Sequence, residues 1–75
     1  MKLTLDKLAI GQQATIEQFT DLDLSLKLLE MGCTPGETIT MLSYAPLGDP
    51  IAIKIDNYLL SLRKKEASTV LVNTI

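Results

Sequence analysis

Residues 45–50 read Ala-Pro-Leu-Gly-Asp-Pro and separate two strand-like runs. The first run is Thr38-Ile39-Thr40-Met41-Leu42, and the second is Ile51-Ala52-Ile53-Lys54-Ile55. Each proline fixes its own φ near about −65° and pushes the residue before it toward extended geometry. Gly48 permits a positive φ that other residues resist. We therefore expect a stiff, shaped connector between two strands, and such loops on small β scaffolds often carry binding function.

The rest of the chain alternates short strand-like runs with turn signals. Residues 51–55 place Ile51, Ile53 and Ile55 on one face, and residues 58–63 continue after Asp56-Asn57, a two-residue hairpin turn. The pattern predicts an all-β domain over residues 1–75: a small barrel or sandwich of about five strands. The expected strands cover residues 13–19, 38–43, 51–55, 58–63 and 68–73.

One short α-helix is expected after the first of these strands, over residues 22–31. Asp21 and Asp23 are candidate N-caps, and Gly32 fits the position just beyond the helix, where left-handed geometry is common. Thr34-Pro35-Gly36-Glu37 has the signature of a type II turn. Single helical turns are expected to begin at Asp6 and to cover residues 64–67.

Composition narrows the function. The 75-residue chain is 47% hydrophobic and carries a net charge of −2, which argues against a nucleic-acid binder and against electrostatic binding to anionic lipid. No apolar run approaches the roughly 20 residues of a membrane span, and the N-terminus lacks the apolar region of a signal peptide. With Cys33 as the single cysteine, a reduced, cytoplasmic setting is expected.

The side chains needed for catalysis or metal binding are sparse. The chain has no histidine, and its nine carboxylates are scattered singly, so we expect no enzymatic activity. No cofactor is expected; if the chain binds Fe(II) or another divalent metal, Cys33 and Asp49 are the candidate ligands, since thiolates and carboxylates bind such ions. For Cys33 we favour a small buried apolar role, because no basic neighbour would lower its pKa. Asp49 fits either a turn-stabilising carboxylate or a contact with a partner or ion.

Four motifs in order carry a family resemblance. They are Leu5-Asp6-Lys7-Leu8-Ala9-Ile10-Gly11, the Leu-Leu-x-x-Gly-x-x-Pro-Gly segment from Leu28 to Gly36, residues 45–50, and Leu62-Arg63-Lys64-Lys65-Glu66-Ala67. The chain resembles the FeoA family of small cytosolic proteins of bacterial ferrous-iron transport, and also the C-terminal module of DtxR-type iron-dependent repressors. The resemblance implies an SH3-like β-barrel and a partner, the membrane Fe(II) transporter FeoB with its GTP-binding domain.

This reading predicts a non-catalytic module that binds the cytoplasmic part of a FeoB-type transporter. Leu24, Leu28 and Met31 share one side of the helix over residues 22–31, and one interpretation is that they dock this helix on the barrel. More leucines lie in the helix than one narrow face needs, so the other interpretation places part of it at an interface, either with the transporter or with a second copy. The alternative is a metal-sensing or peptide-binding SH3-like module linked to iron-dependent transcription, although a proline-rich ligand needs clustered aromatic side chains. The predicted partner-binding residues are Leu24, Leu28, Met31, Pro46, Leu47, Gly48, Asp49, Pro50, Arg63 and Lys64.

Overall fold

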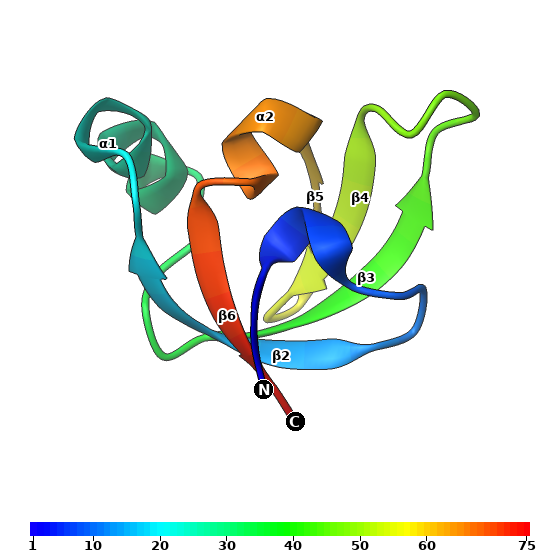
Figure 1. The fold of residues 1–75 in the computed structure, drawn as a ribbon, viewed down its shortest axis with the longest axis horizontal. Coiled ribbons are helices and arrows are strands. Elements are labelled where there is room, and N and C mark those ends of the chain that lie inside the picture. Colours follow the sequence, from blue (N-terminus) through cyan, green and yellow to red (C-terminus); the bar gives the residue numbers. More distant parts are fainter.

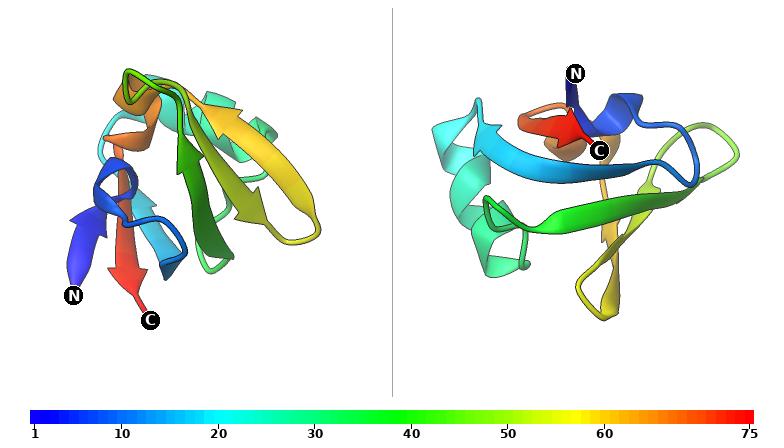
Figure 2. Two further views of the ribbon diagram at one scale, coloured as in Figure 1. Left: turned by 90° about the vertical axis from the view of Figure 1, so that its right-hand side faces the viewer. Right: turned by 90° about the horizontal axis from the view of Figure 1, so that it is seen from below.

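A computed structural model describes residues 1–75 and shows one strongly bent antiparallel sheet (Figures 1 and 2). Its six strands lie in the order β1-β6-β2-β3-β4-β5. The N- and C-terminal ends lie side by side, where β1 pairs with β6. The strands are β1 (Lys2–Thr4), β2 (Gln13–Phe19), β3 (Thr38–Tyr44), β4 (Ile51–Ile55), β5 (Tyr58–Leu62) and β6 (Val70–Thr74); the helices are η1 (Leu5–Lys7), α1 (Leu22–Glu30) and α2 (Lys64–Ala67).

The all-β prediction is confirmed, and the strand that sequence reasoning missed is β1. Its three residues are too short to show an alternating pattern, and its pairing with β6 joins the two ends of the chain. Because β1 comes first, α1 follows the second strand in chain order. The turn expected to begin at Asp6 is the 3₁₀ helix η1, which begins at Leu5, and the Asp6 carboxylate accepts a hydrogen bond from Thr4 Oγ1 at 2.6 Å.

Two register shifts help the sheet to bend around the apolar core. One lies in β2 between Ile16 and Gln18, opposite β6, and the other lies in β3 between Met41 and Ser43, opposite β4. An extra residue at such a point increases the local twist of a strand. The curled sheet encloses a single apolar cluster, which consists of Leu5, Leu8, Ala14, Ile16, Leu28, Cys33, Ile39, Met41, Ile51, Ile53, Ile55, Leu62, Ala67, Val70 and Val72.

Both ends of α1 follow from local sequence. The Asp21 carboxylate accepts a hydrogen bond from the Leu24 amide at 2.9 Å, which caps the first turn. At the other end Gly32 has φ +102°, while the Cys33 amide donates to the Leu28 carbonyl at 2.9 Å and the Gly32 amide donates to that of Leu29 at 3.1 Å. This pair of bonds is the Schellman motif, so the predicted helix and its terminating glycine are confirmed.

The predicted turns are also present. The Glu37 amide donates to the Thr34 carbonyl at 3.0 Å, and Gly36 has φ +96°, as a type II turn requires. Asp56 and Asn57 connect β4 to β5 directly, and of these two residues only Asp56 has a positive φ. The helical turn expected over residues 64–67 is α2. No helix in the structure combines the length and the apolar character needed to cross a membrane.

Candidate partner-binding surface

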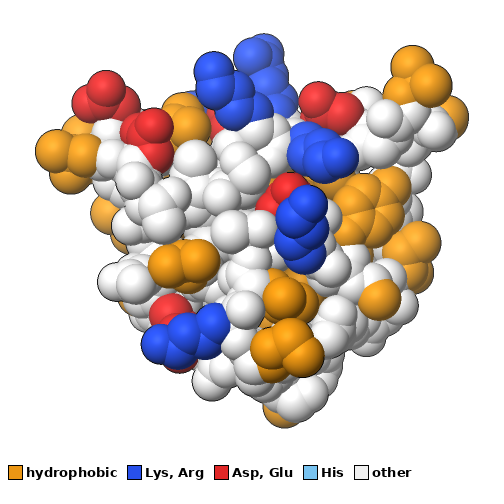
Figure 3. All heavy atoms as spheres, in the orientation of Figure 1, with side chains coloured by type: hydrophobic (Ala, Val, Ile, Leu, Met, Phe, Trp, Pro, Cys, Tyr) orange, Lys and Arg blue, Asp and Glu red, His pale blue; other side chains and the backbone are white.

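One end of the barrel gathers α1, α2 and the β3–β4 loop. Figure 1 shows these three segments along the top of the molecule, and the side view in Figure 2 places them at the same end. In Figure 3, Lys and Arg side chains gather over α2, between apolar side chains over α1 and over the β3–β4 loop. We call this region the helix–loop face; its exposed side chains include Leu22, Leu26, Leu29, Leu47, Arg63, Lys64 and Lys65.

The leucines of α1 divide between the core and this face. Leu28 is 0% exposed and lies in the apolar cluster, whereas Leu22 is 81%, Leu26 61% and Leu29 41% exposed. The prediction that Leu28 contacts a partner is therefore wrong, because its side chain is enclosed by the barrel. Leu24 and Met31, also predicted as contacts, are half-buried and pack against the core. Exposed leucines on a small domain are typical of a binding surface.

The β3–β4 loop presents its apolar residue to solvent. Leu47 is 97% exposed, Pro46 and Pro50 are exposed, and Gly48 has φ +85°. The Ala45 amide donates to the Pro50 carbonyl at 2.9 Å, which closes the base of the loop. The predicted shaped connector is thus present, and Leu47 lies on it with almost no contact to its own chain.

Asp49 attaches the loop to α2. Its carboxylate Oδ1 accepts a hydrogen bond from the Lys64 amide at 2.9 Å, at the first residue of α2. The turn-stabilising alternative predicted a backbone N–H as donor, and the structure supplies that donor from a different element. Because Asp49 satisfies an amide that has no partner within the helix, it fixes the loop relative to Arg63 and Lys64.

Replacing Asp49 by alanine is expected to lower the free energy of unfolding by about 0.5–1 kcal/mol, because the Lys64 amide then loses its acceptor. Urea unfolding followed by circular dichroism measures this difference. Asp49→Asn is the matched variant, since its side-chain carbonyl can still accept the bond and should retain most of the stability. Equal losses in both variants would show that the carboxylate charge matters more than the hydrogen bond.

An ion pair between the exposed Lys27 of α1 and the buried Glu66 of α2 joins the two helices. The Glu66 carboxylate is buried, and it accepts hydrogen bonds from Lys27 Nζ at 2.5 Å and from the Arg63 amide at 3.0 Å. These two hydrogen bonds hold the pKa of Glu66 below its ordinary value. The sequence alone does not indicate this ion pair, because Glu66 and its partner Lys27 lie 39 residues apart in the chain.

The lowered pKa of Glu66 gives a prediction for acid stability. A carboxyl group that is more acidic in the folded state contributes stability that is present above its unfolded pKa, ordinarily 4.5, and is lost as the pH falls through the folded pKa. We expect Glu66→Gln to lower the free energy of unfolding at pH 7 by about 1–2 kcal/mol. Urea unfolding between about pH 3 and 7 measures this difference. The free energy of unfolding of the variant should also depend less on pH, because one carboxyl group with a shifted pKa has been removed.

Tyr58 of β5 closes the other end of α1. Its hydroxyl donates to the Met31 carbonyl at 3.3 Å, and a Cβ placed on Gly32 would lie 1.7 Å from that hydroxyl oxygen. In the sequence, Gly32 is predicted to end the helix only because glycine accepts left-handed backbone geometry. The structure adds a second requirement, because the Tyr58 ring occupies the space that a side chain would need.

Gly32→Ala is expected to lower the free energy of unfolding by about 1–3 kcal/mol, from its positive φ and from displacement of Tyr58. In a Tyr58→Ala background the same substitution should cost only about 1 kcal/mol, because the space is then free. The double-mutant cycle, measured by urea unfolding, separates the two causes. Additive losses would show that the ring moves aside without cost.

The two metal-ligand candidates, Cys33 and Asp49, lie in different surroundings. No three His, Cys, Asp or Glu side chains come together, so neither Cys33 nor Asp49 belongs to such a cluster. Cys33 is fully buried, as predicted, and burial together with the charge of Glu66 raises its pKa to about 11. Tyr44, the third aromatic with Phe19 and Tyr58, donates its hydroxyl to the Leu8 carbonyl.

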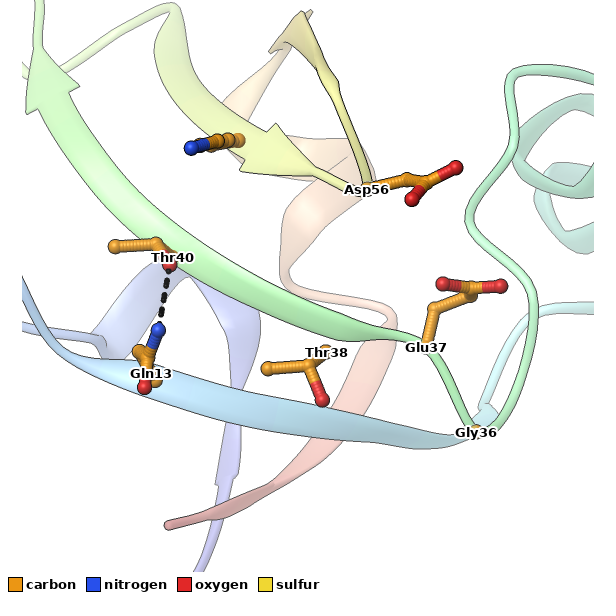
Figure 4. Close-up of a pocket in the computed structure, with 7 residues that line it drawn as sticks. Gln13, Gly36, Glu37, Thr38, Thr40 and Asp56 are labelled. Atoms are coloured by element: carbon orange, nitrogen blue, oxygen red, sulfur yellow. Dashed lines mark hydrogen bonds between the residues drawn. The ribbon is translucent and has the colours of Figure 1, made fainter.

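Two hollows open on the surface. The first, of about 400 Å³, lies between β2, the start of β3 and the β4–β5 turn, and Figure 4 shows the hydrogen bond between Gln13 and Thr40, two of its lining residues. It has no apolar lining residue, unlike most ligand sites. The second, of about 430 Å³, lies beside the beginning of α1 and borders the helix–loop face at Leu22.

The FeoA domain family model matches residues 3–74. The chain belongs to the FeoA family. It is 38% identical over 74 residues to the Fe(2+) transport protein A/Fe(2+) transporter FeoB fusion protein of Porphyromonas gingivalis, a match that covers 97% of this chain. The chain spans 9% of the length of that fusion protein. The resemblance stated from the four sequence motifs is therefore confirmed.

Solved FeoA structures share the fold. A FeoA-like protein from Clostridium acetobutylicum is 32% identical with a TM-score of 0.92, over 99% of this chain and 87% of that one. FeoA of Stenotrophomonas maltophilia, an SH3 domain protein solved with zinc, is 29% identical with a TM-score of 0.81, over 95% and 89%. The SH3-like fold predicted from the resemblance is thus confirmed.

The predicted likeness to iron-dependent repressors concerns the fold alone. IdeR of T. acidophilum has a TM-score of 0.85 at 18% identity, over 99% of this chain and 34% of that one. At this identity the likeness carries no information about ligands. For the metal-sensing or peptide-binding alternative, this comparison therefore supports the fold and identifies no functional residue.

Proposed function

We propose that this chain is a non-enzymatic accessory protein of ferrous iron uptake that acts in the cytoplasm and binds the cytoplasmic part of a FeoB-type Fe(II) transporter. One observation carries the proposal: a relative that is 38% identical over almost the whole chain is a single polypeptide with FeoB. Covalent fusion gives two units a high effective concentration for each other, which is useful when the units act together. The proposal requires a surface of this domain that contacts the transporter.

The helix–loop face supplies the features of such a surface. Leu22, Leu26 and Leu47 offer apolar area that their own fold does not bury. The exposed Arg63, Lys64 and Lys65 add positive charge at α2, and Figure 3 shows Lys and Arg side chains there between apolar side chains. This pattern favours a partner surface with acidic groups around an apolar centre. The hydrogen bond from the Lys64 amide to Asp49 and the ion pair from Lys27 to Glu66 hold the three segments together, so little ordering is needed on binding.

The experiment is binding of the purified chain to the full-length transporter in detergent, with GDP and with a non-hydrolysable GTP analogue. Regulation requires different affinities for two transporter states, because equal affinity shifts no equilibrium. We expect the chain to bind, and its Kd to differ between the two nucleotides. Absence of binding by the folded chain in both states would overturn the proposal.

The Leu22→Gln, Leu26→Gln double variant tests the placement of the surface. Burial of a leucine contributes about 1.5–3 kcal/mol, so this variant should bind at least about tenfold more weakly while keeping its fold. Ile10→Gln is the matched control, because Ile10 is an exposed apolar residue in the loop before β2. Equal affinity of the double variant and the control would place the contact elsewhere.

A further inference from the structure

The strand β5 forms one edge of the sheet and has a neighbour on one side only. It pairs with β4, and the strand order ends there. In the left view of Figure 2, β5 is the outermost strand of the sheet. Edge strands carry a row of backbone N–H and C=O groups that can pair with another chain.

The turn before β5 determines which of its backbone groups point outward. A two-residue turn connects Ile55 to Tyr58, which makes this pair a hydrogen-bonded one. Hydrogen-bonded and non-bonded pairs alternate along an antiparallel ladder, so Leu59 and Ser61 direct their backbone groups away from β4. Outside the ladder with β4, no backbone hydrogen bond involves residues 58–62.

The sequence of β5 lacks the devices that usually protect an edge. Tyr58-Leu59-Leu60-Ser61-Leu62 contains no charge and no proline, and Leu59 is 71% exposed. The opposite edge, β1, is only three residues long and carries Lys2, which pairs with Glu17 at 3.2 Å. Short length and a lysine are two recognised ways to prevent edge pairing. Only one of the two edges is therefore protected.

We infer that β5 pairs antiparallel with β5 of a second copy of this chain. A two-fold axis at Leu60 places Leu59 opposite Ser61 of the second copy, and Ser61 opposite Leu59 of that copy. Both members of each pair direct their backbone groups toward the other strand, so the register permits four inter-chain hydrogen bonds. No residue of the strand carries a charge, so no like charges meet across the axis.

The side chains of β5 are compatible with pairing to β5 of a second copy. Leu60 is half-buried against the core, and the axis sets it beside Leu60 of the second copy, where pairs without hydrogen bonds approach most closely. The exposed Leu59 lies across from the small Ser61, which leaves room for its side chain. A five-residue strand buries less than about 1,000 Å², so the dimer should be weak, with a Kd in the high micromolar to millimolar range.

This pairing is independent of the proposed transporter contact. It uses Leu59, Leu60 and Ser61, and none of these residues belongs to the helix–loop face. Either proposal can therefore fail while the other stands.

Sedimentation velocity over increasing concentrations tests the dimer, with amide hydrogen exchange measured by NMR. We expect reversible dimerisation and concentration-dependent protection of the Leu59 and Ser61 amides. Ser61→Pro removes an N–H that the chain's own ladder does not use, and it should raise the Kd at least about tenfold. A chain that stays monomeric at millimolar concentration would overturn the inference.

Leu59→Lys keeps the test decisive if the proline variant fails to fold. It places a charge on the edge and should also raise the Kd at least about tenfold, as lysine does on natural edges. Ile10→Lys is the matched control, since Ile10 is 66% exposed against 71% for Leu59 but lies in the loop before β2. A dimer that resists Leu59→Lys and is lost in Leu26→Gln would assign the contact to α1 and overturn the β5 pairing.

Discussion

Replacing Leu28 by glutamine is expected to unfold the domain. Truncation of a fully buried leucine costs about 2–5 kcal/mol, and burial of an unpaired amide adds about 1–3 kcal/mol. A domain of this size has a total stability on the order of 5–10 kcal/mol, so the loss consumes most of it. Thermal unfolding followed by circular dichroism should show loss of the cooperative transition, and NMR should show loss of dispersed amide signals.

Leu26→Gln is the control for this prediction, because it makes the same chemical change two residues earlier on the same helix. Leu26 is 61% exposed, so its replacement should change the free energy of unfolding by less than about 0.5 kcal/mol. The variant also reports on function, since Leu26 belongs to the helix–loop face. A Leu28→Gln chain that unfolds cooperatively with a loss under about 1 kcal/mol would show that the barrel tolerates a polar group at its centre.

The contrast between Leu26 and Leu28 marks the limit of sequence reasoning in this chain. Five leucines occupy positions 22, 24, 26, 28 and 29, so they surround the helix and give no single apolar face. The direction of α1 is set by its attachments to the barrel, at Glu66 and Tyr58, both far away in sequence. Local pattern determined that a helix forms here, and long-range contacts determined which side faces inward.

Features decided by neighbouring residues could be predicted. The end of α1 at Gly32, the turn over residues 34–37 and the Asp56-Asn57 hairpin depend on conformations that few residue types accept. The fold followed from the order of these signals and from the family resemblance. The strand β1 could not be predicted, because three residues acquire strand geometry only through their pairing with β6.

The role of Asp49 shows the same limit at the candidate site. Its position in the β3–β4 loop was evident from sequence, and so was its capacity to accept a backbone N–H. Its actual donor, the Lys64 amide, belongs to α2 and lies 15 residues away. A loop sequence describes what a carboxylate can accept, whereas the packing of the loop on α2 decides which donor it meets.

Alkylation of Cys33 by iodoacetamide at pH 8 is expected to be at least about 100-fold slower in the folded chain than in urea. The thiol is fully buried, and its pKa is raised from 9.0 to about 11, mainly by burial and further by Glu66. The reactive thiolate is therefore about 100-fold scarcer in the folded state at this pH, before access is considered. Mass spectrometry of timed samples measures both rates. A Cys33→Ala, Ser43→Cys chain is the control, because Ser43 is exposed on β3.

The raised pKa of Cys33 also predicts how the free energy of unfolding changes at alkaline pH. The folded thiol keeps its proton up to a higher pH than the unfolded thiol, so the folded state binds more protons between pH 9 and about 11. The contribution of the Cys33 thiol to the free energy of unfolding is thus fully present below pH 9 and is lost as the pH rises from 9 to about 11. Burial also raises the pKa of Tyr44, so Cys33→Ala should flatten the alkaline profile without abolishing its slope. Rapid labelling of Cys33 in the folded chain at neutral pH would contradict its burial and restore the thiol as a candidate metal ligand.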